Sequence, residues 1–159
     1  MFAAPSGWSV PTDWLIDGSA YKARVYRTDK PAEIALSNGL ITRRFRLVPN
    51  GATVALDNHM TGASMLRGVK PEAQLVLDGM AFDVGGLKGQ PNYAYLLDEW
   101  VDDLRADPAA FGLVDFEAGP TRKRLEWKRA RYSTDLPWPP PGVGLRMDYR
   151  LRQDAPVVA

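Results

Sequence analysis

Two Asn-Gly pairs within fourteen residues constrain the fold of this chain most strongly. Asn38-Gly39 and Asn50-Gly51 both lie in the segment "IALSNGLITRRFRLVPNGATVAL", each between runs of apolar and β-branched residues. Asparagine tolerates positive φ and glycine adopts it without steric cost, so both pairs suit the two-residue turns that match strand twist. We therefore expect a meander of short antiparallel strands here.

Period-two alternation and turn residues predict further strands along the chain. Asp78-Gly79 gives a second clear hairpin signal, between "AQLVL" and "MAFDV". High glycine (14) and proline (13) content divides the chain about every ten residues, which favours an all-β sandwich. The expected strands cover residues 21–27, 33–37, 40–48, 52–58, 63–68, 73–77, 80–84, 111–119, 121–132 and 144–153.

Two of these strands contain arginine, and the alternation of their residues assigns each arginine to one face of the strand. In 40–48, Arg43 shares a face with Ile41 and Phe45, which predicts that a covered face needs a charge partner for it. In 144–153 one face is apolar and the other charged. The apolar face of that strand is Leu145, Met147, Tyr149 and Leu151, and the charged face is Arg146, Asp148, Arg150 and Arg152.

One helix is expected, at 95–107. Its apolar residues follow a 3.6-residue period, and Pro108 ends it. Asp98 and Asp102, at i and i+4, fall on its polar side, so a solvated acidic face is favoured over a glycosidase-type carboxylate pair. The fold class is therefore all-β, a mainly antiparallel sandwich with one short helix. The apolar stripe consists of Leu96, Leu97, Trp100, Val101 and Leu104.

Composition excludes several classes of partner. Hydrophobic residues at 45% and charged residues at 25% are ordinary for a globular fold. A net charge of +1 produces no overall positive field that would attract nucleic acid, even though arginines cluster between Arg122 and Arg131. No apolar run approaches the roughly 20 residues of a membrane span. We expect neither a nucleic-acid nor a membrane partner.

Few residues suit catalysis, metals or cofactors. The chain has no cysteine and one histidine, His59, in a turn, where a local hydrogen bond is favoured over the base of a catalytic triad. One histidine without cysteine makes zinc unfavourable. The glycine-rich loop 85–92 lacks the phosphate-binding G-x-x-x-x-G-K-[ST] frame. No metal, cofactor or catalytic residue is expected.

Aromatic side chains are the remaining candidates for function. Trp138 lies in the stiff proline-rich loop "PWPPPG", and Tyr93, Tyr95 and Trp100 lie beside the glycine loop. Flat aromatic rings stack on sugars, so these four residues are candidate carbohydrate contacts. The alternative is that each covers the core or a seam between domains.

The phrases "LSNGLITRRFRLVPNGATVALDNHMTGASMLR", "PEAQLVLDG", "VGGLKGQP" and "WPPPG" carry a family resemblance over roughly residues 33–152. The chain resembles the N-terminal β-sandwich of large bacterial α-galactosidase-like (melibiase-like) glycoside hydrolases, also called a supersandwich or galactose-mutarotase-like domain. In that family a (β/α)₈ barrel follows the sandwich and carries the catalytic carboxylates. No position here matches their motifs, so the resemblance implies no catalytic residue in this chain.

The resemblance also implies an organisation. Residues 1–32 would be an N-terminal segment packed on the sheet, and 33–159 a sandwich domain that is a fragment of a longer multidomain chain. Such a domain would support the catalytic barrel of the same parent chain and lend a loop to its carbohydrate cleft. A free-standing carbohydrate-binding module is the alternative, and a homo-oligomer through an exposed sheet edge stays open. The cellular compartment also stays undecided at this point. A periplasmic or secreted location is favoured, because "AAP" near the start is similar to the remnant of a processed precursor.

Overall fold

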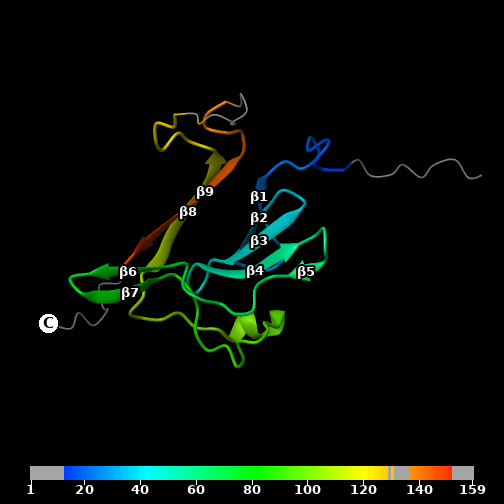
Figure 1. Ribbon diagram of the computed structural model, residues 1–159. Helices are drawn as coiled ribbons and strands as arrows, with labels where there is room; N and C mark the ends of the chain where they lie inside the picture. The colour runs from blue at the N-terminus through cyan, green and yellow to red at the C-terminus, as the bar shows by residue number, and fades with distance from the viewer. Residues whose placement is uncertain (1–12, 129, 131–136, 152–159) are drawn as a thin grey trace, which may run out of the picture.

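The structure, a computed structural model, describes residues 13–128, 130 and 137–151. Within these ranges the chain forms nine strands, all paired antiparallel in their sheets, and one short helix (Figure 1). The expected all-β class with little helix is confirmed. The elements are β1 (Arg24–Arg27), β2 (Glu33–Ser37), β3 (Ile41–Arg46), β4 (Ala52–Asn58), β5 (Ala63–Ser64), β6 (Ala73–Leu77), β7 (Met80–Val84), η1 (Asp98–Asp103), β8 (Gly112–Pro120) and β9 (Val143–Arg150).

The largest sheet has five strands in chain order, β1-β2-β3-β4-β5, so the expected meander is confirmed. A bulge interrupts it, because Arg44 lies opposite Ala55 whereas Phe45 lies opposite Thr53, which leaves Val54 as an extra residue in β4. The strand expected at 63–68 is wrong in length, since only the two residues of β5 pair with β4.

Of the three expected turns, only Asp78-Gly79 has positive φ at both residues, with values of 51° and 80°. Leu77 pairs with Met80, so this is a two-residue primed turn. The chain does reverse at Asn38-Gly39, but Asn38 is not in the positive-φ region, so the primed turn type expected there is wrong. Its side-chain Oδ1 instead accepts hydrogen bonds from the backbone N–H groups of Leu40 and Ile41.

Asn50-Gly51 is not a two-residue turn either. The Asn50 side chain is 1% exposed and bonds to the backbone at the start of β8, through Leu113 N–H and the Phe111 carbonyl. A Cβ on Gly51 would lie 2.6 Å from the hydroxyl of Tyr149 in β9. This Asn-Gly pair therefore marks the place where the β8–β9 ribbon lies against the large sheet.

The two faces of β3 divide as the alternation predicts. The Arg43 guanidinium lies over the Phe45 ring, 4.6 Å from its centroid, and its Nη2 is 2.5 Å from Oε2 of Glu72. Glu72 is thus the charge partner expected for Arg43. Arg44 and Arg46 point to the opposite face.

The hydrophobic core lies between β4 and the segment that contains η1. The predicted α-helix at 95–107 is wrong in type and length, because η1 is a six-residue 3₁₀ helix with extended backbone at Leu97 and Leu104. No side chain caps its first turn and no basic residue lies in its last turn, so little stabilises a longer helix. The core residues are Ala52, Val54, Val69, Leu87, Val101 and Leu104, with Leu96 packed against them.

β6 and β7 form a hairpin that pairs only with itself among the described strands and points away from the large sheet (Figure 1). Leu75 lies opposite Phe82 and Leu77 opposite Met80, so these four apolar residues share one face. Leu75 is 43% exposed and Leu77 47%. Much of this apolar face is therefore open to solvent.

The β8–β9 ribbon has the amphipathic character that its sequence predicts. Tyr149 lies opposite Leu113 and Met147 opposite Phe116, which confirms the apolar face. On the other face Glu117 lies opposite Arg146. Each of the two ribbons thus carries one apolar face, and neither face is fully covered by the described residues.

The strand expected at 121–132 is wrong where the structure describes it, since 121–128 and 130 lie outside any strand. Pro140 and Pro141 stand on the opposite side of this loop and have no N–H to donate, so the β8–β9 ladder ends at Pro120 and Val143.

The N-terminal segment contributes an edge strand, β1, to the large sheet. Its Tyr21 ring lies against Gly39, and Trp14 is 41% exposed. Trp8, Arg131, Arg152 and the final residues 153–159 lie outside the described residues.

Candidate functional site

Two exposed indoles meet in the loop that joins β8 to β9. The rings of Trp127 and Trp138 have centroids 5.1 Å apart and planes inclined by 37°, and each residue is 41% exposed. The Trp138 indole N–H donates to the Leu125 carbonyl at 3.2 Å, which fixes its orientation. We call Trp127 and Trp138 the indole pair. The sequence pointed to Trp138, and the structure gives it a partner.

A small pocket opens at the same end of the ribbon. Its volume is about 50 Å³, which suits a group of a few heavy atoms. Three arginines and one glutamate are among the residues that line it. The lining consists of Glu117, Gly119, Pro120, Arg122, Arg124, Gly144 and Arg146, and we call it the arginine-lined pocket.

The charges of this pocket are only partly balanced. Glu117 accepts a 2.5 Å hydrogen bond from Arg122 and lies 3.5 Å from Arg146. Arg146 also pairs with Asp148 at 2.9 Å, and Asp148, followed by Glu117, raises the pKa of Arg146. Arg124 forms no ion pair with any residue that the structure describes. The pocket therefore keeps an excess of positive charge.

The second aromatic group predicted from the sequence splits into two contacts. Tyr95 and Trp100 face each other with ring centroids 5.3 Å apart. Tyr93 instead carries the Lys70 ammonium over its ring, 4.0 Å from the centroid. Tyr93 and Tyr95 are each 46% exposed, but one ring face of Tyr93 is already occupied. These residues do not form a common platform.

A buried amide holds the backbone around this group. The Gln90 side chain is 7% exposed, and its Oε1 accepts a hydrogen bond from Val69 N–H. The two N–H groups of its Nε2 are shared among three nearby carbonyl oxygens, those of Arg67, Asn92 and Tyr95. The glycine-rich loop is thus a packed element, and a Cβ on its Gly85 would lie 2.3 Å from the Gly51 carbonyl oxygen.

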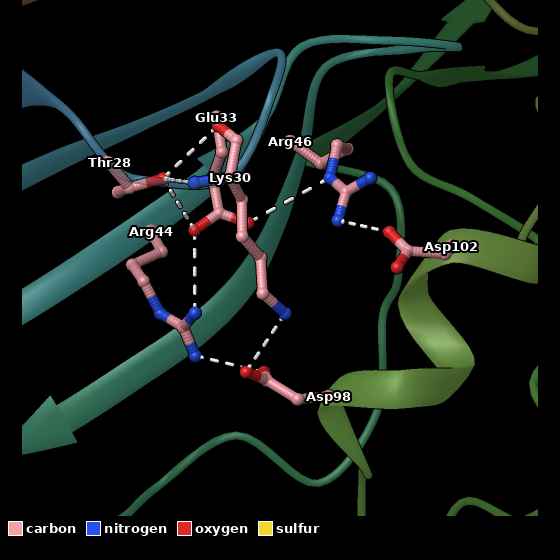
Figure 2. Close-up of polar contacts among 7 residues, drawn as sticks. All are labelled: Thr28, Lys30, Glu33, Arg44, Arg46, Asp98 and Asp102. Atoms are coloured by element: carbon pink, nitrogen blue, oxygen red, sulfur yellow. Dashed lines mark hydrogen bonds and ion pairs between the residues drawn. The ribbon is translucent and has the colours of Figure 1, made fainter.

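A network of charges joins η1 to β2 and β3, as Figure 2 shows. Glu33, only 1% exposed, lies 3.4 Å from Arg44 and 3.8 Å from Arg46. Arg44 also binds Asp98 at 3.0 Å, and Arg46 contacts Asp102 at 2.7 Å without a well-aligned hydrogen bond. The network fastens η1 onto the sheet.

This arrangement agrees with the solvated position expected for the helix carboxylates and adds partners that the sequence did not predict. Asp98 and Asp102 are 55% and 66% exposed, but both are paired to arginines of β3 and do not form a free acidic face. Desolvation raises the pKa of Asp98, but hydrogen bonds from Arg44 and Lys30 outweigh it and hold that pKa below its ordinary value. A glycosidase acid needs a raised pKa, so Asp98 does not suit that role.

His59 makes the local hydrogen bond expected of it. Its Nε2 lies 2.7 Å from the Thr42 hydroxyl, which also bonds to Ser37. No hydrogen bond in the described part of the chain joins His59 to a carboxylate. Over the same residues no group of three or more histidine and acidic side chains could hold a metal ion.

The described residues also contain no candidate for a membrane-spanning helix. No helix within the described ranges has the length and apolar character to cross a bilayer.

Two wider grooves lack reactive pairs. One, of about 300 Å³, is lined by Arg43, Glu72 and Lys70, but the first two are bonded to each other. The other, of about 580 Å³, lies between Tyr21, Asn38 and the Pro141 loop. Neither groove brings a nucleophile and a base together.

Sequence reasoning missed the arginine-lined pocket. Its signal was the alternation of 144–153, which places Arg146 on the charged face of a strand, and a partner strand ending in "FEAGPTR". It also missed Glu33, which no local pattern distinguishes from a surface glutamate.

Comparison with known proteins finds no matching family model, no matching curated protein and no matching solved structure.

Proposed function

We propose that this chain is a non-catalytic β-sandwich domain of an α-galactosidase-like glycoside hydrolase, which packs on the catalytic barrel of its parent protein. The observation that carries this proposal is the solvent-exposed apolar face of the β6–β7 ribbon, together with the only partly covered apolar face of the β8–β9 ribbon. An isolated two-stranded ribbon is marginally stable in water, and exposed apolar surface of this kind marks protein contacts. The barrel named by the family resemblance is the partner that would cover these faces.

The carboxylates support a role without catalysis. A retaining or inverting glycosidase needs one carboxylic acid with a raised pKa beside a second, free carboxylate. Here the pKa values of Asp98 and Asp107 are lowered, chiefly by bonds from cations: Arg44 and Lys30 at Asp98 against an opposing desolvation, and Lys88 at Asp107. Both side chains serve the packing of the chain.

The test is association with the catalytic barrel encoded in the same parent gene, measured by sedimentation velocity. We expect a one-to-one complex that Leu77→Lys abolishes, because this residue lies on the apolar face of β6. Val76→Lys is the matched control, since Val76 is 67% exposed on the opposite face of the same strand. Self-association in place of the complex, or turnover of aryl glycosides by the chain alone, would contradict the proposal.

A second candidate is a carbohydrate-binding module, which the indole pair favours. Two exposed, mutually fixed rings offer a sugar a large apolar surface at little entropic cost. Saturable change in tryptophan fluorescence with oligosaccharides, lost in Trp138→Ala, would support it. An unchanged response in Trp138→Ala would place any sugar elsewhere.

A further inference from the structure

We infer that the tip of the β8–β9 ribbon binds an acidic saccharide, with its carboxylate or sulfate in the arginine-lined pocket and a sugar ring on the indole pair. The inference deepens the carbohydrate-binding candidate and rests on it. It does not require the catalytic barrel.

The pocket supplies the recognition of the anion. Arg124 has its donors free of any carboxylate in the described chain, and Arg122 and Arg146 share Glu117. Guanidinium groups bind carboxylate and sulfate oxygens through paired hydrogen bonds. A volume of about 50 Å³ accommodates one such group and leaves the sugar ring outside.

The indole pair lies next to the pocket along the backbone. Arg124 is followed directly by Leu125, whose carbonyl accepts the Trp138 indole N–H. Two adjacent residues therefore have these two roles. The Leu125 carbonyl holds the Trp138 ring, and Arg124 supplies a guanidinium that is not paired with any described carboxylate. The inference requires that an anion held by Arg124 brings the sugar ring that bears it onto these aromatic faces.

The base of the loop is held in place. The Thr121 hydroxyl donates to the Pro140 carbonyl at 2.6 Å, and Thr121 N–H donates to the Gly142 carbonyl at 3.3 Å. These bonds tie the two arms of the loop together beside the pocket. A site ordered before binding loses less entropy when its ligand arrives.

A saccharide fits these features better than nucleic acid. Single-stranded nucleic acid needs a basic groove that follows several phosphates. Here the positive charge surrounds one small pocket, and the whole chain has a net charge of only +1. One anionic group beside one aromatic surface is the pattern of a uronic acid or a sulfated sugar.

Isothermal titration of the full chain with four probes tests the inference. The probes are trigalacturonic acid, its methyl ester, a galactose trisaccharide bearing one sulfate, and an oligothymidylate of equal charge. We expect the acid to bind about tenfold more tightly than its ester, which is the effect of one added charge-assisted contact. The sulfated sugar shows whether sulfate replaces carboxylate.

Variants locate the site. Arg124→Gln should weaken binding of the acid about tenfold and leave binding of the ester unchanged. Arg150→Gln removes the same charge from β9 outside the pocket and should have no effect. Trp138→Ala should weaken both acid and ester, whereas Trp138→Phe should retain part of the affinity if the ring acts by stacking. Thermal melting of each variant shows that it is folded.

The outcomes separate the two levels of the argument. Equal affinity for acid and ester overturns this inference and leaves the carbohydrate-binding candidate standing. Tighter binding of oligothymidylate also overturns it. No binding of any saccharide overturns both the inference and that candidate, while the proposed contact with the barrel is tested independently.

Discussion

The side-chain carbonyl of Asn50 accepts a 2.8 Å hydrogen bond from the backbone N–H of Leu113, 63 residues further along the chain. The same side chain donates to the Phe111 carbonyl and accepts from Gly51 N–H. The bonds to Leu113 and Phe111, formed at a residue only 1% exposed, join the turn before β4 to the start of β8. One buried amide thus fixes the β8–β9 ribbon, with its pocket and indole pair, against the large sheet.

Asn50→Ala should lower the free energy of unfolding by about 3 kcal/mol, because it removes the side-chain acceptor of the Gly51 and Leu113 N–H groups and one of the two donors to the Phe111 carbonyl. Asn38→Ala is the control, since Asn38 makes only local bonds within its turn. It should cost about 1 kcal/mol. Urea unfolding followed by tryptophan fluorescence measures both, and equal losses would contradict the role given to Asn50.

Gly51→Ala should cost about 1–3 kcal/mol by overpacking, since the new Cβ would stand 2.6 Å from the Tyr149 hydroxyl. Tyr149→Phe removes that oxygen, so Gly51→Ala should cost less when it is combined with Tyr149→Phe. Gly119→Ala is the matched control, because no atom lies within 4 Å of its Cβ position. A double-mutant cycle by urea unfolding measures the coupling, and strict additivity would rule out the contact.

One tyrosine should ionise late. Desolvation, helped by Glu72, raises the pKa of Tyr149 from 10.0 to about 12, although Arg43 opposes this. The folded state therefore keeps its proton longer than the unfolded state. The stability linked to this group is complete below about pH 10 and is lost as the pH rises toward 12. Alkaline titration of the tyrosinate absorbance should show one late step, which Tyr149→Phe removes; an unchanged titration curve in that variant would refute the assignment.

Acid should weaken the network around η1. Desolvation raises the pKa of Asp98, but the bonds from Arg44 and Lys30 lower it by more, so the net pKa is below 3.8. A lowered pKa stabilises the folded state above the unfolded value and loses that contribution as the pH falls through the folded one. Asp98→Asn should therefore destabilise the chain at neutral pH and progressively less as the pH falls below 3.8. Asp103→Asn, on the same helix, is the control, and a pH-independent effect of Asp98→Asn would contradict the argument.

The sequence predicted where the chain reverses better than how it does so. Asp78-Gly79 forms the expected turn because Leu77 and Met80 pair directly across it. Asn50-Gly51 has the same local pattern. However, the conformation of these two residues is set by contacts with Phe111, Leu113 and Tyr149, which lie far away in the sequence. Local propensity cannot show such contacts.

The candidate site was predictable only in part. Trp138 was singled out because a proline-rich loop holds it at the surface. Its partner Trp127 lay in a segment expected as a strand, which the prolines on the other side of the loop prevent. The pocket depends on the pairing of Glu117 with Arg146, and cross-strand register follows from the folded ribbon.

Amide hydrogen exchange, measured on the chain alone and in the presence of the proposed catalytic barrel, tests the central claim most directly. The claim is that the apolar ribbon faces are contact surfaces of a domain without catalytic groups. We predict slower exchange in β6, β7, β8 and β9 on addition of the barrel, with β1 and β5 unchanged and no glycoside hydrolysis by the chain alone. Unchanged exchange in both ribbons at saturating barrel, or hydrolysis by the isolated chain, would contradict the account.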